Sequence, residues 1–237
     1  MKEKKINTIA VIIARGGSKR IFKKNIKLFL GKPIISYSIK TALKCGFFDE
    51  IMVSTDDKEI AEISKSNGAK IPFIRSEKNS SDISTTADVI EEVLISYKKI
   101  GINPKYVCCI YPTAPLLDFR TLRGAYDIIT KKDIKSVIPV SKFSYPIQRA
   151  LVLENKKIKM NWPENTNKRS QDLKEFYHDV GQFYFLKVES FLKEQLLFTD
   201  FTYPIELPSI LAQDIDTIED WKIAEFKYTF LKNNNFL

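Results

Sequence analysis

A basic, glycine-containing segment at residues 15–25 has the composition of a phosphate-binding loop. It reads RGGSKRIFKKN and directly follows an apolar run at residues 9–14. Gly16 and Gly17 allow the backbone to approach a ligand closely and to point N–H groups at phosphate oxygens. The segment holds five cationic side chains: Arg15, Lys19, Arg20, Lys23 and Lys24. This charge density suits a triphosphate, whose negative charge must be offset before attack at phosphorus. A solvated basic loop is the alternative.

Asp214 and Asp216 form a candidate site for a divalent cation. Side chains two positions apart in an extended segment point to the same side, so both carboxylates can face one ligand. Carboxylate oxygens suit Mg²⁺, which fills its remaining coordination positions with water and substrate phosphates. The alternative is that Asp216 merely caps a helix that begins near Thr217.

Two other polar segments have both a functional and a structural interpretation. Residues 79–88 read NSSDISTTAD, and their hydroxyl groups can bind a ribose or phosphate or can cap the start of a helix. His178 is the single histidine and stands next to Asp179. It is a candidate acid or base, but no serine or cysteine nucleophile motif accompanies it, so a hydrolase triad is not supported. A structural or substrate-contacting histidine is the alternative.

Alternating strands and helices precede residue 141 and predict an α/β fold with a parallel sheet. The predicted strands cover residues 9–14, 51–54, 71–74, 107–111 and 136–140, and the predicted helices cover residues 34–44, 58–67, 85–98 and 119–130. Ligands of such sheets bind beyond the carboxyl ends of the strands. We therefore expect the site in the loops that follow these strands.

The regular alternation stops at about residue 141. A hairpin and a further strand are predicted beyond it, at residues 150–154, 157–160 and 182–186. We interpret residues 141–185 as an insertion that covers the site or pairs with a second subunit, within a single domain over residues 1–237. A capping signature at Thr217 and Asp220 predicts a last helix. Its expected buried face comprises Ile218, Trp221, Ala224, Tyr228 and Leu231.

The charge of the chain favours anionic partners. Its 38 lysine and arginine residues exceed its 29 aspartate and glutamate residues, which gives a net charge of +9. Because the excess lysine is spread over the chain with no arginine-rich arm, we expect no nucleic-acid partner. The longest apolar run, at residues 9–14, is far too short to span a membrane, and residues 1–10 lack the apolar core of a signal peptide.

The cysteine residues and two missing motifs argue against further classes of protein. Cys45, Cys108 and Cys109 match neither a disulfide framework nor a zinc pattern, so we expect reduced thiols in a cytoplasmic protein. The patterns GxxxxGK[ST] and GxGxxG are both missing from the sequence. A P-loop NTPase and an NAD-binding protein are therefore disfavoured.

Five motifs in order resemble the cytidylyltransferases that activate nonulosonic acids such as sialic acid. They are IIARGGSKR with KKN at residues 12–25, LGKPI at 30–34, VSTDDKEIA at 53–61, YPTAPL at 111–116 and QDIDT at 213–217. The resemblance spans nearly the whole chain, and the combination is specific although each motif alone is not. It implies a Rossmann-like, three-layer α/β/α nucleotidyltransferase fold with a small dimerisation lobe.

Within that family the chain looks most like the branch that uses pseudaminic acid. The matching segments are SYPIQRA at residues 144–150, RSQDL at 169–173 and YHDVGQFY at 177–184. Sialic acid enzymes carry glutamine where this chain has Tyr111. One departure is Phe22, where relatives of the pseudaminic type have proline. The same reaction on N-acetylneuraminic or legionaminic acid, a non-catalytic nucleotide-binding module and a glycosyltransferase are the alternatives.

The resemblance implies an Mg²⁺-dependent reaction of CTP with a nine-carbon 2-keto sugar acid in a homodimer. The anomeric hydroxyl attacks the α-phosphorus and pyrophosphate leaves, which gives a CMP-sugar for cell-surface glycans or flagellin glycosylation. The resemblance also implies which residues bind the nucleotide substrate: Arg15, Gly16, Gly17, Ser18, Lys19, Lys24, Asn25, Arg75, Ser81 and Tyr111. Those implied to face the sugar are Gln148, Arg169, His178 and Gln182, with Arg169 reaching the neighbouring subunit's site. Asp214 and Asp216 are implied to ligate Mg²⁺, and Arg15, Lys19, Lys24 and Asp216 to carry catalysis.

Overall fold

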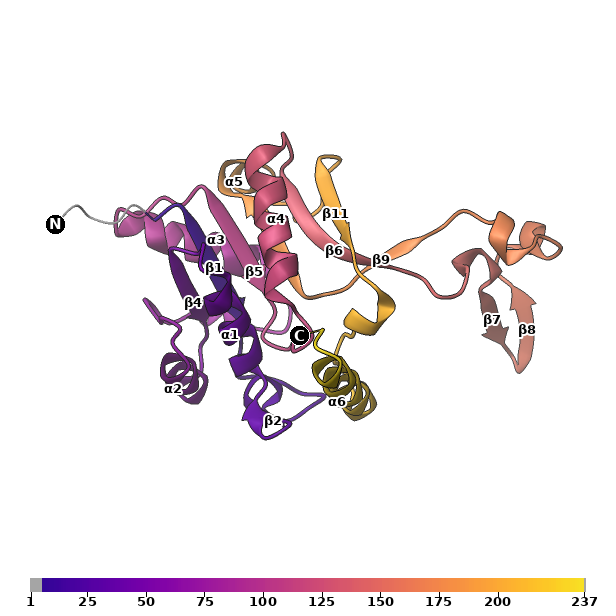
Figure 1. Cartoon of the computed structure of the whole chain (residues 1–237), viewed down its shortest axis with the longest axis horizontal. Helices are drawn as coiled ribbons and strands as arrows, with labels where there is room; N and C mark the ends of the chain where they lie inside the picture. Colours follow the sequence, from indigo (N-terminus) through magenta and orange to yellow (C-terminus); the bar gives the residue numbers. More distant parts are fainter. Residues whose placement is uncertain (1–5, 237) are drawn as a thin grey trace.

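The computed structural model of the chain describes residues 6–236 and arranges them around one main sheet. Within these residues, seven strands pair in the order β11-β6-β10-β5-β1-β4, with β9 attached to β6 (Figure 1). The strands are β1 (Thr8–Ile13), β4 (Glu50–Ser54), β5 (Tyr106–Ile110), β6 (Ser136–Lys142), β9 (Tyr177–Asp179), β10 (Phe183–Lys187) and β11 (Thr202–Glu206). Two smaller pairs lie outside it: β2 (Leu28–Phe29) with β3 (Lys32–Pro33), and β7 (Leu151–Glu154) with β8 (Lys157–Met160).

The main sheet is mixed, which corrects the predicted parallel sheet. β4, β1 and β5 are parallel, and β6 is parallel to β11. β10 lies between β5 and β6 and is antiparallel to both. The reason is the route of the chain, which leaves the sheet after β6, forms the inserted segment and returns from the same end. A strand that enters from that end pairs antiparallel with its neighbours.

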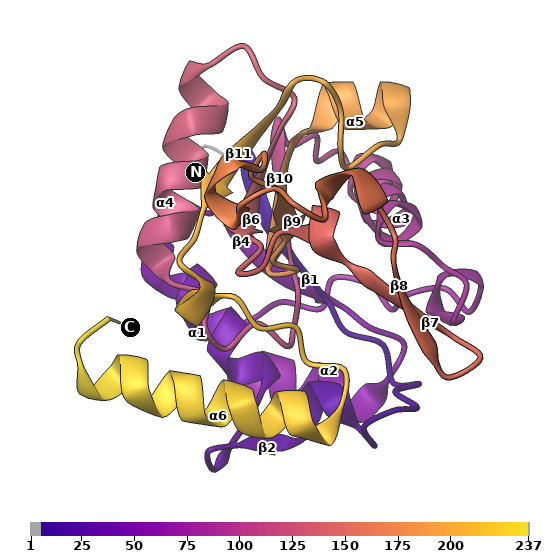
Figure 2. The ribbon, with the colours of Figure 1, turned by 90° about the vertical axis from the view of Figure 1, so that its right-hand side faces the viewer.

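Helices cover both faces of the main sheet and give the predicted three layers (Figure 2). On one face lie α1 (Ile35–Cys45), α2 (Lys58–Ser66) and α4 (Phe119–Lys131), and on the other lie α3 (Thr86–Lys99) and α5 (Val188–Glu194). Alternate residues of β1 enter the two cores: Ala10 and Ile12 pack on the first face, and Ile9 and Val11 on the second. Burial on both faces explains why β1 is apolar throughout.

Residues 71–74, predicted as a strand, do not form one. Lys70 makes an isolated bridge to Met52, and Ile74 is 56% exposed. Pro72 has no N–H to donate to a neighbouring strand, so the ladder does not continue past it. The other helices and strands predicted before residue 141 are confirmed, with ends shifted by one or two residues.

Residues 143–176 form an arm that projects from the body of the protein (Figure 1). The arm contains the predicted hairpin, β7 and β8, with Asn155 and Lys156 in left-handed conformation at its turn. The predicted insertion at residues 141–185 is too long, because β9 and β10 at its end belong to the main sheet. Short 3₁₀ turns lie at Lys24–Ile26, Lys78–Ser80, Ile147–Arg149, Pro163–Asn165, Ser170–Asp172 and Ser209–Leu211.

The last helix, α6 (Ile218–Asn233), packs beside β2 at the edge of the body. Thr217 and Asp220 form the predicted capping box at its start. Trp221 and Ala224 are buried as predicted, but Ile218 is 47% exposed. The helical repeat places Ile218 at the edge of the apolar stripe rather than on it, which corrects that part of the predicted face.

Candidate active site

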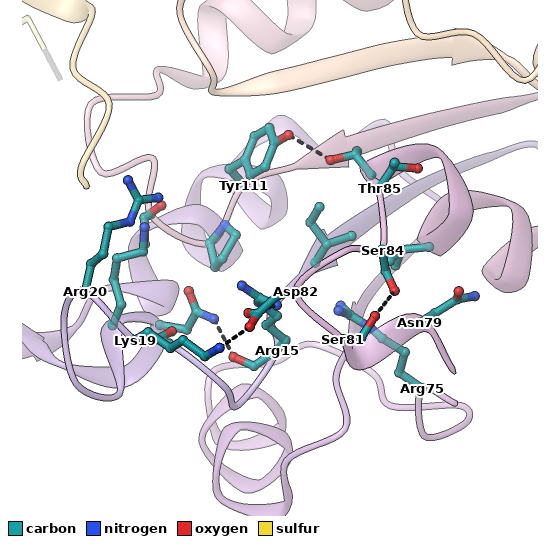
Figure 3. Close-up of a pocket in the computed structure, with 18 of the residues that line it drawn as sticks. Arg15, Lys19, Arg20, Arg75, Asn79, Ser81, Asp82, Ser84, Thr85 and Tyr111 are labelled. Carbon is teal, nitrogen blue, oxygen red and sulfur yellow. Dashed lines mark hydrogen bonds and ion pairs between the residues drawn. The ribbon is translucent and has the colours of Figure 1, made fainter. Parts of the chain in front are cut away.

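A cavity of about 260 Å³ lies beyond the carboxyl ends of β1 and β5 (Figure 3). The basic loop after β1, the segment from Arg75 to Val89 and the residues that follow β5 line it. Nine residues singled out from the sequence are in its wall: Arg15, Ser18, Lys19, Arg20, Lys24, Asn25, Arg75, Ser81 and Tyr111. The position agrees with the rule that α/β sheets bind ligands at the carboxyl ends of their strands.

Gly16 and Asn25 shape the basic loop. The N–H of Gly16 donates to Asp56 Oδ1 at 3.0 Å, and a Cβ at Gly16 would lie 2.8 Å from Asp57 Oδ2. A larger residue therefore fits only if the Asp57 side chain moves. The side-chain amide of the buried Asn25 donates to the Arg15 carbonyl at 2.8 Å. Gly17, by contrast, has no atom within 4 Å of the position that a Cβ would take, and neither glycine is in the wall of the cavity.

Arg15 and Lys19 share one carboxylate across the cavity. Arg15 Nη1 lies 2.7 Å from Asp82 Oδ1, and Lys19 Nζ pairs with Asp82 Oδ2 (Figure 3). The hydrogen bond from Lys19 is the main cause that lowers the pKa of Asp82, with smaller contributions from the charges of both cations. Two cations from the β1 loop thus converge on a point where an anion can sit.

Asp216 neutralises two further cations of the loop. Arg20 Nη1 lies 2.7 Å from Asp216 Oδ2, and Lys24 Nζ lies 3.6 Å from Asp216 Oδ1. Lys23, the fifth cation, pairs with Glu59 of α2 and is not part of the cavity wall. Four cations therefore serve the cavity, which corrects the expectation that all five do.

Arg75 is fixed beside the cavity by the end of β4. It is 6% exposed, its Nε donates to Ser54 Oγ at 2.9 Å, and its Nη2 donates to the Ser54 carbonyl. Burial lowers the pKa of Arg75, and the charge of Asp56 opposes that shift. The guanidinium has further N–H groups that can donate to an acceptor in the cavity.

Tyr111 joins the wall of the cavity to α3. Its hydroxyl lies 2.8 Å from Thr86 Oγ1, and burial raises its pKa to about 12. The phenol is therefore neutral at physiological pH and can donate or accept a hydrogen bond. Its ring is edge-on to that of Tyr184, with 5.9 Å between the centroids, and Tyr184 donates to Asp179.

The hydroxyl-rich segment at residues 79–88 caps a helix, as one of its two interpretations predicted, and it also lines the cavity. Thr85 and Asp88 form a capping box at the start of α3. Ser81 and Ser84 lie in the cavity wall with their hydroxyl oxygens 2.8 Å apart. The capping residues hold the segment in place, and the serines are polar groups in the wall of the cavity.

Asp214 and Asp216 are not the cap of α6, since Thr217 and Asp220 provide it. The interpretation of Asp216 as a helix cap is therefore wrong. Burial raises the pKa of Asp214, and the charge of Asp216 raises it further. Among the described residues, no three His, Cys, Asp or Glu side chains gather into a metal site. Asp214 is exposed and Asp216 is partly exposed, so both carboxylates are open to a cation. Such a pair still fits Mg²⁺, whose other ligands are water and phosphate oxygens.

The four residues expected to face the sugar do not line this cavity. Gln182 is buried and donates to the Leu211 carbonyl at 2.7 Å, so it supports the segment before the aspartate pair. His178 lies edge-on to Phe143, at the root of the arm. Gln148 and Arg169 lie within the arm and bond to Lys174 and Asp172. In a single chain these four residues are therefore separate from the cavity beyond β1 and β5.

Asp82 and Thr86 line the cavity but were not selected from the sequence. Both lie in the hydroxyl-rich segment that the sequence did indicate. The signal located the segment, but which of its side chains turn toward the cavity depends on the turn that precedes α3.

Three comparisons relate the chain to known proteins. A family model described as cytidylyltransferase matches residues 9–232. A pseudaminic acid cytidylyltransferase from Campylobacter jejuni subsp. jejuni serotype O:2 is 43% identical, over 94% of this chain and 97% of the relative. A CMP-N,N'-diacetyllegionaminic acid synthase from Legionella pneumophila is 30% identical, over 92% of this chain and 94% of the relative.

Solved structures show the same fold at lower identity. A CMP:2-keto-3-deoxy-manno-octonic acid synthetase complexed with CTP superimposes with a TM-score of 0.65 and 17% identity, over 96% of this chain and 99% of that chain. The match confirms the predicted three-layer nucleotidyltransferase fold.

Across the described residues, none of the helices has the length and apolar character that crossing a bilayer requires.

Proposed function

The chain belongs to the cytidylyltransferase family, and we propose that it transfers the CMP group of CTP to pseudaminic acid. The anomeric hydroxyl of this nine-carbon 2-keto sugar acid attacks the α-phosphorus of CTP. A new P–O bond forms, the bond to the β-phosphate oxygen breaks, and pyrophosphate leaves with the electron pair. The hydroxyl proton goes to solvent or to a carboxylate of the site.

The convergence of four cations on one cavity is the observation that carries this proposal. Arg15, Lys19, Arg20 and Lys24 can offset the charge of the triphosphate and of the leaving pyrophosphate. Because Ser81, Arg75 and Tyr111 lie on the α3 side of the same cavity, we assign the ribose and the cytosine to that side. A fixed guanidinium and a neutral phenol offer directional hydrogen bonds to a base.

Asp214 and Asp216 are the residues that would hold Mg²⁺. A bound Mg²⁺ would supply charge neutralisation at the α-phosphate and would ease deprotonation of the attacking hydroxyl. Lys24 donates to the Ile215 carbonyl at 2.8 Å, between the two aspartates, and so positions this segment against the basic loop. Arg20 pairs with Asp216, so a cation held by that carboxylate would leave the guanidinium free to bind phosphate.

We propose that the arm makes the protein a homodimer. Leu151, Leu153 and Ile158 are 63%, 71% and 66% exposed. The pairing of Leu153 with Ile158 and of Leu151 with Met160 puts these side chains on one face of the hairpin. A second copy of the arm can cover this face, and Arg169 would then reach the partner's site.

The acid substrate is assigned from the relatives. The chain is 43% identical to a pseudaminic acid enzyme but 30% identical to a legionaminic acid enzyme. The direct test is pyrophosphate release from CTP and Mg²⁺ with pseudaminic, legionaminic or N-acetylneuraminic acid. Release with pseudaminic acid alone is the expected result. Release with another acid would support the same reaction but assign a different sugar acid as the substrate. No release from folded protein that binds CTP contradicts the proposal.

A further inference from the structure

Asp82 occupies the position that the proposed function gives to an anionic ligand. Its Oδ1 lies 2.7 Å from Arg15 Nη1, and its Oδ2 pairs with Lys19 Nζ (Figure 3). Each carboxylate oxygen therefore takes one cation, as two oxygens of a phosphate group can. The Asp82 side chain is 44% exposed, so solvent and ligands reach it directly.

The loop that carries Asp82 does not depend on this carboxylate for its shape. Ser84 donates to the Lys78 carbonyl at 2.8 Å, and Ser76 donates to Glu92 of α3 at 2.7 Å. Ile83, the next residue, is 90% exposed and packs into no core. Breaking the ion pairs of Asp82 therefore sacrifices neither apolar burial nor the hydrogen bonds that hold the loop.

We infer that Asp82 is an intramolecular competitor for the phosphates of CTP. It holds Arg15 and Lys19 in the free protein, gives them up to the triphosphate, and takes them back as pyrophosphate leaves. The inference rests on the proposed function. A triphosphate carries several negative charges against one on the carboxylate, so it displaces Asp82 more readily than a ligand with a single phosphate.

The competition weakens every ligand that needs both cations. The apparent affinity equals the intrinsic affinity multiplied by the fraction of protein in which Arg15 and Lys19 are free. Because the two ion pairs are exposed to solvent, each contributes little. Removing both raises phosphate affinity by about three- to tenfold on this scale. The carboxylate thus lowers the affinity for CTP and, in return, speeds the departure of pyrophosphate.

The test is calorimetric titration of wild type, Asp82→Asn and Asp82→Glu with CTP, CMP and pyrophosphate, without sugar acid. Asp127→Asn on α4, where Asp127 pairs with Lys131, makes the same charge change away from the cavity. We expect Asp82→Asn to bind CTP and pyrophosphate about three- to tenfold more tightly, and CMP with a smaller gain. Asp82→Glu, which keeps a carboxylate, and Asp127→Asn should stay within about twofold of wild type. Product inhibition by pyrophosphate should strengthen in Asp82→Asn alone.

Equal or weaker binding of CTP and pyrophosphate by Asp82→Asn overturns the inference, since the carboxylate would then not compete with phosphate. An equal gain in Asp127→Asn also overturns it, because net charge alone would explain the effect. If neither wild type nor Asp82→Asn binds CTP, the proposed function fails as well. If wild type binds CTP and Asp82→Asn binds it no better, the inference alone fails. Matching thermal unfolding midpoints exclude misfolding as the cause.

Discussion

The cavity and the arm differ in how their polar and apolar groups are supported. Around the cavity, functional side chains follow strands whose apolar residues are fully buried, such as Ile12 and Ile110. In the arm, apolar residues such as Leu153 and Ile158 are mostly exposed, and the hairpin lies away from the main sheet (Figure 1). One region has its core within the chain, and the other lacks one.

This difference implies that the cavity and the arm have separate functions. The cavity has its cations, its carboxylates and its hydrogen-bond donors in place in a single chain, so we expect CTP to bind without a partner. Of the residues expected to face the sugar, Gln148 and Arg169 lie in the arm and His178 lies at its root. The hairpin of the arm exposes an apolar face, which is typical of an interaction surface. Binding of CTP and transfer to the sugar acid should therefore respond to different mutations.

The largest expected effect is at the aspartate pair. Asp216→Asn should reduce Mg²⁺-dependent turnover by at least ~100-fold, because it deletes a preorganised charge next to the phosphates. Initial rates of pyrophosphate release over a series of Mg²⁺ concentrations measure this. Asp127→Asn is the control, and near-normal turnover of Asp216→Asn would remove the assignment of the metal site.

Arg15→Ala should weaken CTP binding by about tenfold or more, on the scale of a hydrogen bond to a charged group. Lys23→Ala is a matched control, since Lys23 is in the same loop but pairs with Glu59 outside the cavity. Calorimetry on both variants checks the prediction. Equal losses in the two would mean that the loop acts through its general charge rather than through the cavity.

Charges placed on the exposed face of the hairpin should impair dimerisation and sugar-acid binding but not CTP binding. The double variant Leu153→Glu with Ile158→Lys keeps a favourable cross-strand pair but removes the apolar face. We expect this variant to be a monomer by light scattering and to bind CTP with unchanged affinity. The KM for the sugar acid should rise about tenfold, which is the scale of one lost guanidinium–carboxylate contact. Lys157→Gln, at a solvent-exposed position of the same hairpin, should remain dimeric. A double variant that stays dimeric with normal KM contradicts the role of the arm.

Tyr111→Phe should have the smallest effect. It removes the hydroxyl that pairs with Thr86, and one neutral hydrogen bond corresponds to about two- to tenfold in CTP affinity. The ring and its contact with Tyr184 remain, so folding should not change. An unchanged KM for CTP would place the base away from Tyr111.

Local sequence signals predicted most elements near the cavity, because burial on both faces and capping residues act over short distances. β1 and the capping box of α6 are examples, as is the capped start of α3. Signals of the same kind failed where distant contacts decide. The antiparallel insertion of β10 depends on the path of the arm. The strand predicted at residues 71–74 failed for a local reason instead, because Pro72 has no N–H to donate to a neighbouring strand.

The candidate site divides in the same way. The types and spacing of Arg15, Lys19 and Asp216 indicated their chemistry, and the structure brings them to one place. The pairing of Asp82 with two cations was not predictable, since it joins a loop after β1 to a loop before α3. Gln148 and Arg169 matched a family pattern, but a single chain keeps them in the arm.

A crystal structure of the protein with CTP and Mg²⁺ tests the central claim most directly. The account predicts the triphosphate on Arg15, Lys19, Arg20 and Lys24, the cytosine beside Arg75 and Tyr111, and Asp82 turned away from its two cations. A nucleotide bound elsewhere, or phosphates that leave the four cations paired with Asp82 and Asp216, would contradict it.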